Sequence, residues 1–225
     1  MSNNDKESGR RGDWRQTVSG KMYWPADPRP EEVDIRDLAH HLATINRFGG
    51  AAREPYSVAE HLVRASYIAA PGFELETLLH DAGEGLIGAD LIRPVKRSDL
   101  FNPLWEDLEA RNQKAAHVRL GVPTEDRFVE EEHAAIEICG RTLHVDFGPN
   151  GLSGGLVLMR HMMPKEVKDA DNVMLMTEVR DLMAEPPMTW RESAHRPLEQ
   201  KIVPYAWNVA RDLFLERFFE LGGWA

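Results

Sequence analysis

Cysteine is almost absent from this chain, which has a single one, Cys139, among 225 residues. One thiol excludes an internal disulfide framework and a zinc site made of thiolates, because each needs several cysteines. Long apolar runs are also lacking, and none approaches the ~20 residues that a membrane-spanning helix needs. The polar N-terminus contains no hydrophobic segment of the kind that directs secretion. These absences predict a cytoplasmic protein with no membrane partner.

Basic residues are too few to give the chain a broad attraction for nucleic acid. Its 27 Lys and Arg side chains stand against 37 Asp and Glu, a formal net charge of -10. Such a charge repels polyanions and acidic membranes, although a local basic pocket is compatible with it. We therefore expect a small-molecule partner rather than a nucleic-acid polymer.

The composition is that of an ordinary globular protein, with 42% hydrophobic and 28% charged residues. Such a chain can bury a substantial core, and its length suits one domain. Residues 1–18 are polar and show no periodicity, which predicts a disordered N-terminal arm. The remainder, 19–225, is predicted to form a single domain.

Apolar residues recur at helical spacing through most of this domain. Breaks at Gly and Pro bound the predicted helices, which cover approximately 34–48, 57–70, 73–87, 103–120, 124–139, 164–182 and 198–221. Strands are scarce, so we expect a mostly-α helical bundle with little or no β structure beyond a short hairpin within 18–30. The glycine-rich segment 146–155 lacks the spacing of a phosphate-binding loop, and a flexible surface loop is expected there.

The first candidate site residue lies at the start of the helix over 57–70. Ser57 followed by Glu60 is a capping box, in which the serine oxygen accepts from the amide three residues on and the glutamate reaches back. This pattern fixes the start of the helix and places His61 in its first turn.

The next helix carries two carboxylates beside a second histidine. Each residue advances about 100° around a helix axis, so Asp81 lies ~100° and Glu84 ~40° from His80. All three border the apolar stripe of that helix, which contains Leu78 and Leu79. Half-buried carboxylates are costly unless a positive charge lies among them. The arrangement therefore indicates a divalent cation.

A further acidic position interrupts the apolar stripe of the helix over 164–182. Asp171 lies one turn before Leu175, and Glu178 falls on the same stripe. Asp169 points to the opposite side and is expected to be an ordinary solvated acid. Taken alone, Asp171 would be the partner of a helix end or of an arginine. Together with the upstream histidines, it is predicted to be a metal ligand.

Five short motifs occur along the chain, in an order that matches a known family. They are INR at 45–47, SVAEH at 57–61, LHDAGE at 79–84, RPVK at 93–96 and KDADN at 168–172. With the H…HD…D pattern of His61, His80, Asp81 and Asp171, they resemble the HD-domain phosphohydrolases over roughly residues 30–181. The resemblance is to bacterial 5′-deoxynucleotidases and to phage relatives that destroy dATP. It implies a helical HD domain that hydrolyses nucleotides, in the host cytoplasm if a phage encodes it.

The resemblance implies one divalent metal ion per chain, with His61, His80, Asp81 and Asp171 as its ligands. Two imidazoles and two carboxylates suit Mn²⁺, Co²⁺, Fe²⁺ or Zn²⁺ better than Mg²⁺, which prefers an all-oxygen shell. An ion of this kind lowers the pKa of a coordinated water. Glu84 is placed to orient that water or to move its proton, and it is the predicted catalytic residue.

Four further residues are predicted to bind the substrate. Arg47 and Lys96 are the expected phosphate contacts, because their cationic groups suit phosphate oxygens. Phe48 can stack on a base, with a position in the core as the alternative. Asp90 is expected to contact the sugar, although Gly88-Ala89-Asp90 stands where relatives have Gly-Asp.

Several functional alternatives stay open on the sequence alone. The hydrolase could act on a deoxynucleoside monophosphate or on a dNTP such as dATP. A phosphodiesterase of cyclic or linear dinucleotides would favour a second metal ion, for which His117, His133 and His144 are candidates. A nucleotide sensor without catalysis is the remaining alternative. The long final helix, rich in phenylalanine, could also pack between chains of a homo-oligomer.

Overall fold

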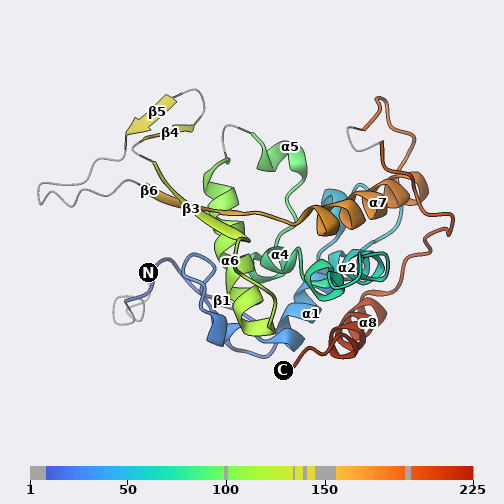
Figure 1. Cartoon of the computed structure of the whole chain (residues 1–225), viewed down its shortest axis with the longest axis horizontal. Coiled ribbons are helices and arrows are strands. Elements are labelled where there is room, and N and C mark those ends of the chain that lie inside the picture. Colours follow the sequence, from blue (N-terminus) through green and yellow to red (C-terminus); the bar gives the residue numbers. More distant parts are fainter. Residues whose placement is uncertain are drawn as a thin grey trace, which may run out of the picture.

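The computed structural model of the chain describes residues 9–98, 101–133, 135–138, 141–144, 156–190 and 194–224. Helices dominate these residues, and the strands form only two-stranded sheets (Figure 1). The predicted mostly-α fold class is confirmed. The glycine-rich segment 146–155, predicted to be a surface loop, lies outside the described residues.

The elements follow one another along the chain with short connections. The α-helices are α1 (Ile35–Thr44), α2 (Val58–Tyr67), α3 (Glu74–Leu78), α4 (Ala82–Ile87), α5 (Arg93–Lys96), α6 (Leu104–Leu120), α7 (Lys165–Leu182) and α8 (Trp207–Glu220). Two 3₁₀ helices cover Pro30–Glu32 and Arg47–Gly50. The strands are β1 (Arg15–Gln16), β2 (Met22–Tyr23), β3 (Phe128–His133), β4 (Ala135–Ile138), β5 (Arg141–His144) and β6 (Leu156–His161).

The core lies where α1, α2, α4 and α8 meet. α1 packs against the other three helices, and α6 packs against α4. Leu38 and Leu42 of α1, Leu62 of α2 and Phe214 and Phe218 of α8 are fully buried. Burying a side chain of this size contributes about 1.5–3 kcal/mol relative to leaving it exposed. α7 packs against α2 and α3, and this contact brings together residues far apart in the sequence.

A close contact between α4 and α6 fixes the segment that precedes α4. A Cβ at Gly83 would lie 2.9 Å from the carbonyl oxygen of Glu109, so the two helices need glycine here. The side-chain oxygen of Gln113 accepts from the Gly83 amide at 2.7 Å, and its nitrogen donates to the Leu79 carbonyl at 2.6 Å. α6 therefore holds the chain on both sides of His80.

The start of α2 follows only half of the predicted capping box. Ser57 is the N-cap, and its Oγ accepts from the Glu60 amide at 3.2 Å. The Glu60 carboxylate does not reach back to the cap. It accepts instead from Arg64 Nε at 2.9 Å and from the Tyr205 amide at 2.8 Å. Glu60 thereby ties α2 to the extended segment before α8.

Four predicted helices are shorter or interrupted. The helix predicted over 57–70 ends at Tyr67. The helix predicted over 34–48 ends at Thr44, because Asn46 pairs with Ser57 in an antiparallel bridge. The helix predicted over 73–87 is two helices, α3 and α4, separated at residues 79–81. The final helix begins at Trp207 rather than near residue 198, because the segment before it runs extended.

The helix predicted over 124–139 is wrong. β3 runs antiparallel to β6, with Phe128 opposite His161 and His133 opposite Leu156, and β4 pairs with β5 in the same sense. The strand that pairs with β3 lies far along the sequence, beyond the reach of local periodicity. β6 packs on α6, so this ribbon leaves the helical body along that helix (Figure 1).

Residues 9–18, expected within a disordered arm, pack against the body instead. The buried Arg10 guanidinium pairs with Asp27 at 2.7 Å and lies over the Trp24 ring at 4.3 Å. Arg15 donates to the Leu86 carbonyl at 2.9 Å, and strand β1 pairs with β2. The hairpin predicted within 18–30 therefore begins earlier, with its first strand at Arg15–Gln16. Local composition gave no sign of these contacts, because each partner lies elsewhere in the chain.

We expect acid to destabilise the protein through His117, a buried residue of α6. Its Nε2 accepts from Gln113 at 2.8 Å and its Nδ1–H donates to the Pro123 carbonyl at 3.1 Å, which satisfies the neutral ring. Burial lowers the pKa of His117 from 6.5 to about 4. The unfolded chain therefore binds a proton between these values that the folded chain does not, and stability falls as pH drops from 6.5 towards 4.

His117 alone should account for about 2 kcal/mol of lost stability between pH 7.5 and pH 5. Urea denaturation at the two pH values measures this loss in the wild type and in His117→Gln. The variant should start less stable at pH 7.5 but lose about 2 kcal/mol less on acidification. Equal losses in both proteins would contradict the assignment.

Candidate metal centre

Three side chains from separate elements converge on one point. His61 comes from the first turn of α2, His80 from the break between α3 and α4, and Asp171 from the middle of α7. His61 Nε2 lies 3.4 Å from His80 Nε2 and 3.3 Å from Asp171 Oδ1, and His80 Nε2 lies 3.8 Å from the same oxygen. Their ligand atoms all lie within 4.8 Å of one another, so this cluster could hold a metal ion.

The atoms behind the two imidazoles support this interpretation. Glu178 Oε1 lies 2.6 Å from His61 Nδ1, and the Thr77 carbonyl lies 2.7 Å from His80 Nδ1. Each partner accepts a hydrogen bond from Nδ1–H, which leaves Nε2 of the neutral ring with its lone pair directed at the cluster. Metal-bound histidines in proteins are oriented in this way. The donor set therefore fits a divalent ion.

The charges around the cluster are strongly coupled. Desolvation and Arg47 act to lower the pKa of His61, yet Glu178 and Asp171 raise it to about 9. Desolvation acts to raise the pKa of Asp171, but its hydrogen bond to His61 and the charge of His80 hold it far below its usual range. Without a metal ion the cluster thus attracts a proton, and a divalent ion would supply the positive charge that the carboxylates favour.

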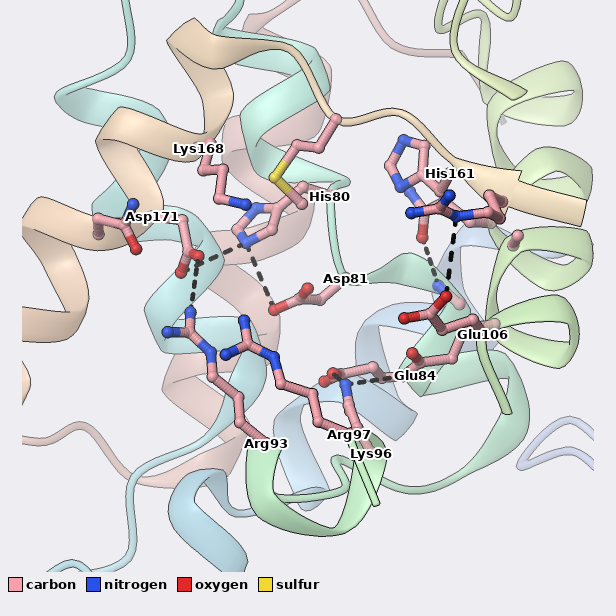
Figure 2. A pocket seen from close by; sticks show the side chains of 17 residues that line it. His80, Asp81, Glu84, Arg93, Lys96, Arg97, Glu106, His161, Lys168 and Asp171 are labelled. Atoms are coloured by element: carbon pink, nitrogen blue, oxygen red, sulfur yellow. Dashed lines mark hydrogen bonds and ion pairs between the residues drawn. The ribbon is translucent and has the colours of Figure 1, made fainter. Parts of the chain in front are cut away.

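Asp81, predicted as a fourth ligand, borders the cluster. Its Oδ2 lies 3.4 Å from His80 Nε2 and 3.5 Å from the guanidinium of Arg47. Desolvation acts to raise the pKa of Asp81, but His80, His61 and Arg47 outweigh it and lower that pKa. Figure 2 shows the Asp81 carboxylate directed towards His80. Its role as a ligand stays a prediction.

The Arg47 side chain is buried next to the metal cluster rather than exposed to solvent. Its Nε donates to Glu178 Oε2 at 3.2 Å, and only 8% of the residue is exposed. The backbone places it there, because the Arg47 amide donates to the Tyr56 carbonyl at 2.9 Å just before α2. Arg47 thus links two carboxylates, Glu178 and Asp81, while the predicted phosphate contact is untested.

Glu84, the predicted catalytic residue, is buried beside the cluster in α4. Its Oε1 accepts from Lys96 at 2.6 Å, and the same ammonium group pairs with Glu109 at 2.7 Å. Glu84 Oε2 is buried and has no hydrogen-bond partner among the described residues. Burial and the charge of Asp81 raise the pKa of Glu84 well above its usual range, an effect that Lys96 opposes. A carboxyl in this state is suited to taking and giving a proton.

Phe48 and Asp90 line a cavity of about 940 Å³ next to the cluster, together with Arg47 and Lys96. Phe48 has φ 60 and ψ 20, a left-handed backbone conformation that is strained for an aromatic residue. Strain of this kind concentrates at functional sites. Burial raises the pKa of Asp90, against the opposing effect of Arg47. The four predicted substrate residues thus share one cavity.

Of the three further histidines, the structure describes the side chains of His117 and His133, and these two do not take part in a second metal site. His117 is occupied by Gln113 and Pro123, and His133 belongs to β3. The side chain of His144 lies outside the described part of the chain. Among the residues that the structure describes, only the cluster of His61, His80 and Asp171 groups three ligands in this way.

Several site residues had no role assigned from the sequence. Glu178 was visible on the apolar stripe of its helix, and its position two turns after Asp171 was the available signal. Arg93 pairs with Asp171 at 3.4 Å. Lys168, one turn before Asp171, lines a second and smaller cavity of about 580 Å³ that also borders the cluster. Arg93 and Lys168 lie in the RPVK and KDADN motifs. The motifs indicated the correct segments of the chain but not the contacts of these two residues.

The comparisons with known proteins leave the family open. No protein-family model matches the chain. It is 38% identical over 119 residues to the uncharacterized protein RCAP_rcc00048 of Rhodobacter capsulatus, a match that covers 49% of this chain and 59% of that protein. It is also 27% identical over 208 residues to the uncharacterized protein YfdR of Escherichia coli, covering 92% of this chain and 94% of that protein. Neither name states an activity.

Within the described part of the chain, no helix combines the length and the apolar content that crossing a membrane requires.

Proposed function

We propose that this chain is an HD-type, metal-dependent phosphohydrolase that acts on 2′-deoxynucleotides. The observation that carries the proposal is the buried cluster of His61, His80 and Asp171, each from a different element, at the edge of a large cavity. The spacing of these residues matches the H…HD…D pattern. Glu84 lies beside them, with one carboxylate oxygen that has no hydrogen-bond partner among the described residues. The enzyme needs no polymer partner for this reaction.

One divalent ion per chain would be held by His61, His80 and Asp171, with Asp81 at its border. Imidazole and carboxylate ligands favour Mn²⁺, Co²⁺, Fe²⁺ or Zn²⁺. When bound, such an ion supplies a water of lowered pKa and polarises the phosphoryl group.

The protein's own residues would then orient the reactants and carry the proton. Glu84 Oε2 would accept the proton of the attacking water, while Lys96 keeps Oε1 in place. Arg47 fixes Asp81 and Glu178 and so positions the ligands rather than reacting. Phe48 and Asp90 would contact the nucleoside in the larger cavity.

A reconstitution assay tests the proposal. The purified chain is stripped with a chelator, reloaded separately with each of the four metals, and incubated with a panel of dNMPs and dNTPs. Activity should be absent after stripping and return with metal. Turnover of dinucleotides alone would favour the phosphodiesterase, whereas a stable nucleotide complex without product would favour a sensor. No turnover of any nucleotide with any metal would contradict the proposal.

Replacing Glu84 should remove catalysis while leaving metal bound. Glu84→Gln keeps the shape of the side chain but cannot accept a proton, so kcat should fall by about 10²–10⁴-fold. Glu109→Gln is the matched control, because it changes the other carboxylate on Lys96. We expect it to lower kcat far less. Metal content by elemental analysis and steady-state kinetics provide the measurements, and similar losses in the two variants would refute a special role for Glu84.

A further inference from the structure

The larger cavity beside the metal cluster is lined by a second aromatic residue, Trp190, to which the sequence assigned no role. The volume of this cavity is about 940 Å³, within the range of roughly 300–1,000 Å³ that is usual for small-molecule sites. Trp190 meets Phe48 edge-on, with ring centroids 6.4 Å apart. Phe48 precedes α2 whereas Trp190 follows α7, so segments far apart in the sequence form this aromatic pair.

The Phe48 ring is held in place by its neighbours. A Cβ at Gly49 would lie only 3.2 Å from Ile92 Cγ2, so the turn that carries Phe48 packs closely on the loop before α5. The Arg47 guanidinium lies over the Phe48 ring, with its central carbon 5.5 Å from the ring centroid. Phe48 therefore presents a fixed aromatic ring to the cavity.

The segment that carries Trp190 is anchored at its ends but not along its length. α7 ends at Leu182, whose carbonyl accepts from the Arg53 amide at 2.8 Å. Beyond the segment, the Ile202 amide donates to Asp181 at 2.8 Å and returns the chain to α7. Between these points, residues 184–190 form a loop (Figure 1) that makes no backbone hydrogen bond with any other described residue.

This segment is rich in apolar residues although it lies at the surface. Met188, for example, lines the cavity and is 81% exposed. Pro186-Pro187 stiffens the segment, because proline fixes its own φ and has no amide hydrogen that needs an acceptor. A stiff segment loses little conformational entropy when a ligand binds against it. Residues 183–190 are therefore suited to covering a ligand in the cavity.

The chemistry of the ligand follows from the two kinds of lining residue. The cavity reaches the metal cluster, because Asp81, Glu84 and Asp171 also line it, and Lys96 adds a positive charge there. A ligand that fills the cavity therefore needs an anionic group near the cluster and a flat apolar part near the aromatic pair. A nucleotide has both, since its base has two π faces on which aromatic side chains stack.

We infer that Trp190 stacks on the base of the nucleotide and covers it in the larger cavity, an inference that rests on the proposed function. Trp190 acts through binding and takes no part in proton transfer. It determines specificity for nucleotides over phosphate esters that lack a base. Trp190 lies outside residues 30–181, where the HD-type motifs occur, so those motifs do not account for this contact.

The kinetic test separates KM from kcat in the metal-loaded enzyme. Trp190→Ala should raise KM for each deoxynucleotide by about 5–150-fold, the cost of losing one stacked base. The kcat should change far less, because the contact is the same in the ground state and the transition state. Trp190→Phe keeps an aromatic ring and should recover most of the affinity. Trp207→Ala is the matched control, because Trp207 is 48% exposed on α8 and lines neither cavity.

Deoxyribose 5-phosphate, which has no base, shows whether the effect of Trp190 is specific. Its KM as a substrate, or its inhibition constant against a deoxynucleotide, should be the same in wild type and Trp190→Ala. A merely structural role of Trp190 would weaken the binding of both kinds of phosphate ester.

A binding test by fluorescence does not depend on turnover. 2′-Deoxyadenosine should quench the tryptophan emission of the metal-free chain, whereas deoxyribose 5-phosphate should leave it unchanged. Trp190→Phe should lose this response, because Trp190 is the only tryptophan among the described residues that line the larger cavity. Trp207→Phe should keep it.

Each outcome decides between the inference and its alternatives. An unchanged KM in Trp190→Ala, an equal loss for deoxyribose 5-phosphate, or quenching retained in Trp190→Phe would overturn the inference, while turnover of nucleotides would leave the proposed function standing. Quenching by 2′-deoxyadenosine that requires Trp190, without turnover of any nucleotide with any metal, would contradict the proposed function but support the base contact.

Discussion

Asp171→Asn is expected to abolish high-affinity metal binding and to lower kcat/KM by well over 100-fold. Asparagine keeps the shape of the side chain but removes the only carboxylate among the three clustered ligands. Losing an outer contact of a metal ligand typically costs about 10–100-fold in affinity or activity, so losing the ligand itself should cost more. The remaining imidazoles, His61 and His80, would have to hold the ion without a compensating negative charge.

The metal-induced rise in melting temperature measures this loss directly. With free metal at 100 times its Kd, binding stabilises the wild type by about 2.7 kcal/mol, which is roughly 5–11 °C for a chain of this size. Asp171→Asn should show almost no rise. Asp169→Asn makes the same change on the same helix, at an exposed carboxylate paired with Lys165, and should keep the full rise. Metal binding retained in Asp171→Asn would remove Asp171 from the site.

The helical character of the fold could be predicted from the sequence because it depends on local signals. Apolar spacing, the cap at Ser57 and the breaks at Gly and Pro act within a few residues of one another. The β3–β6 ribbon could not be predicted in this way, since each strand owes its conformation to a partner distant in sequence. The same reason explains Arg10, whose buried guanidinium depends on Asp27 and Glu32.

In the site, the identity of the metal-binding residues could be predicted from the sequence, whereas their contacts could not. His61, His80 and Asp171 could be predicted because polar residues on the apolar stripe of a helix need a partner. The H…HD…D spacing suggested that this partner is a metal ion. The break between α3 and α4 directs His80 at the cluster. It could not be predicted, because the helical spacing of apolar residues continues across it. The position of Arg47 also depends on tertiary structure, because its two carboxylate partners come from different helices.

Glu178→Ala should destabilise the fold and weaken metal binding at the same time. Glu178 is fully buried, and its two oxygens lie 2.6 Å from His61 Nδ1 and 3.2 Å from Arg47 Nε. Removing it leaves the Arg47 charge buried without its main partner, which costs about 3–5 kcal/mol in comparable pairs. His61 would also lose the acceptor that fixes its ring, and metal affinity should fall about 10–100-fold.

Three variants separate these two effects of Glu178. Glu178→Gln keeps an oxygen for His61 but removes the charge opposite Arg47, so it should retain more metal affinity than stability. Glu166→Ala removes an exposed glutamate from the first turn of the same helix and should leave both quantities close to wild type. For Glu178→Ala, a loss of about 3–5 kcal/mol corresponds to a melting temperature lower by roughly 6–20 °C. A melting temperature within a few degrees of wild type, with unchanged metal affinity, would mean that Glu178 neither orients His61 nor neutralises Arg47, and that the ligands are held by packing alone.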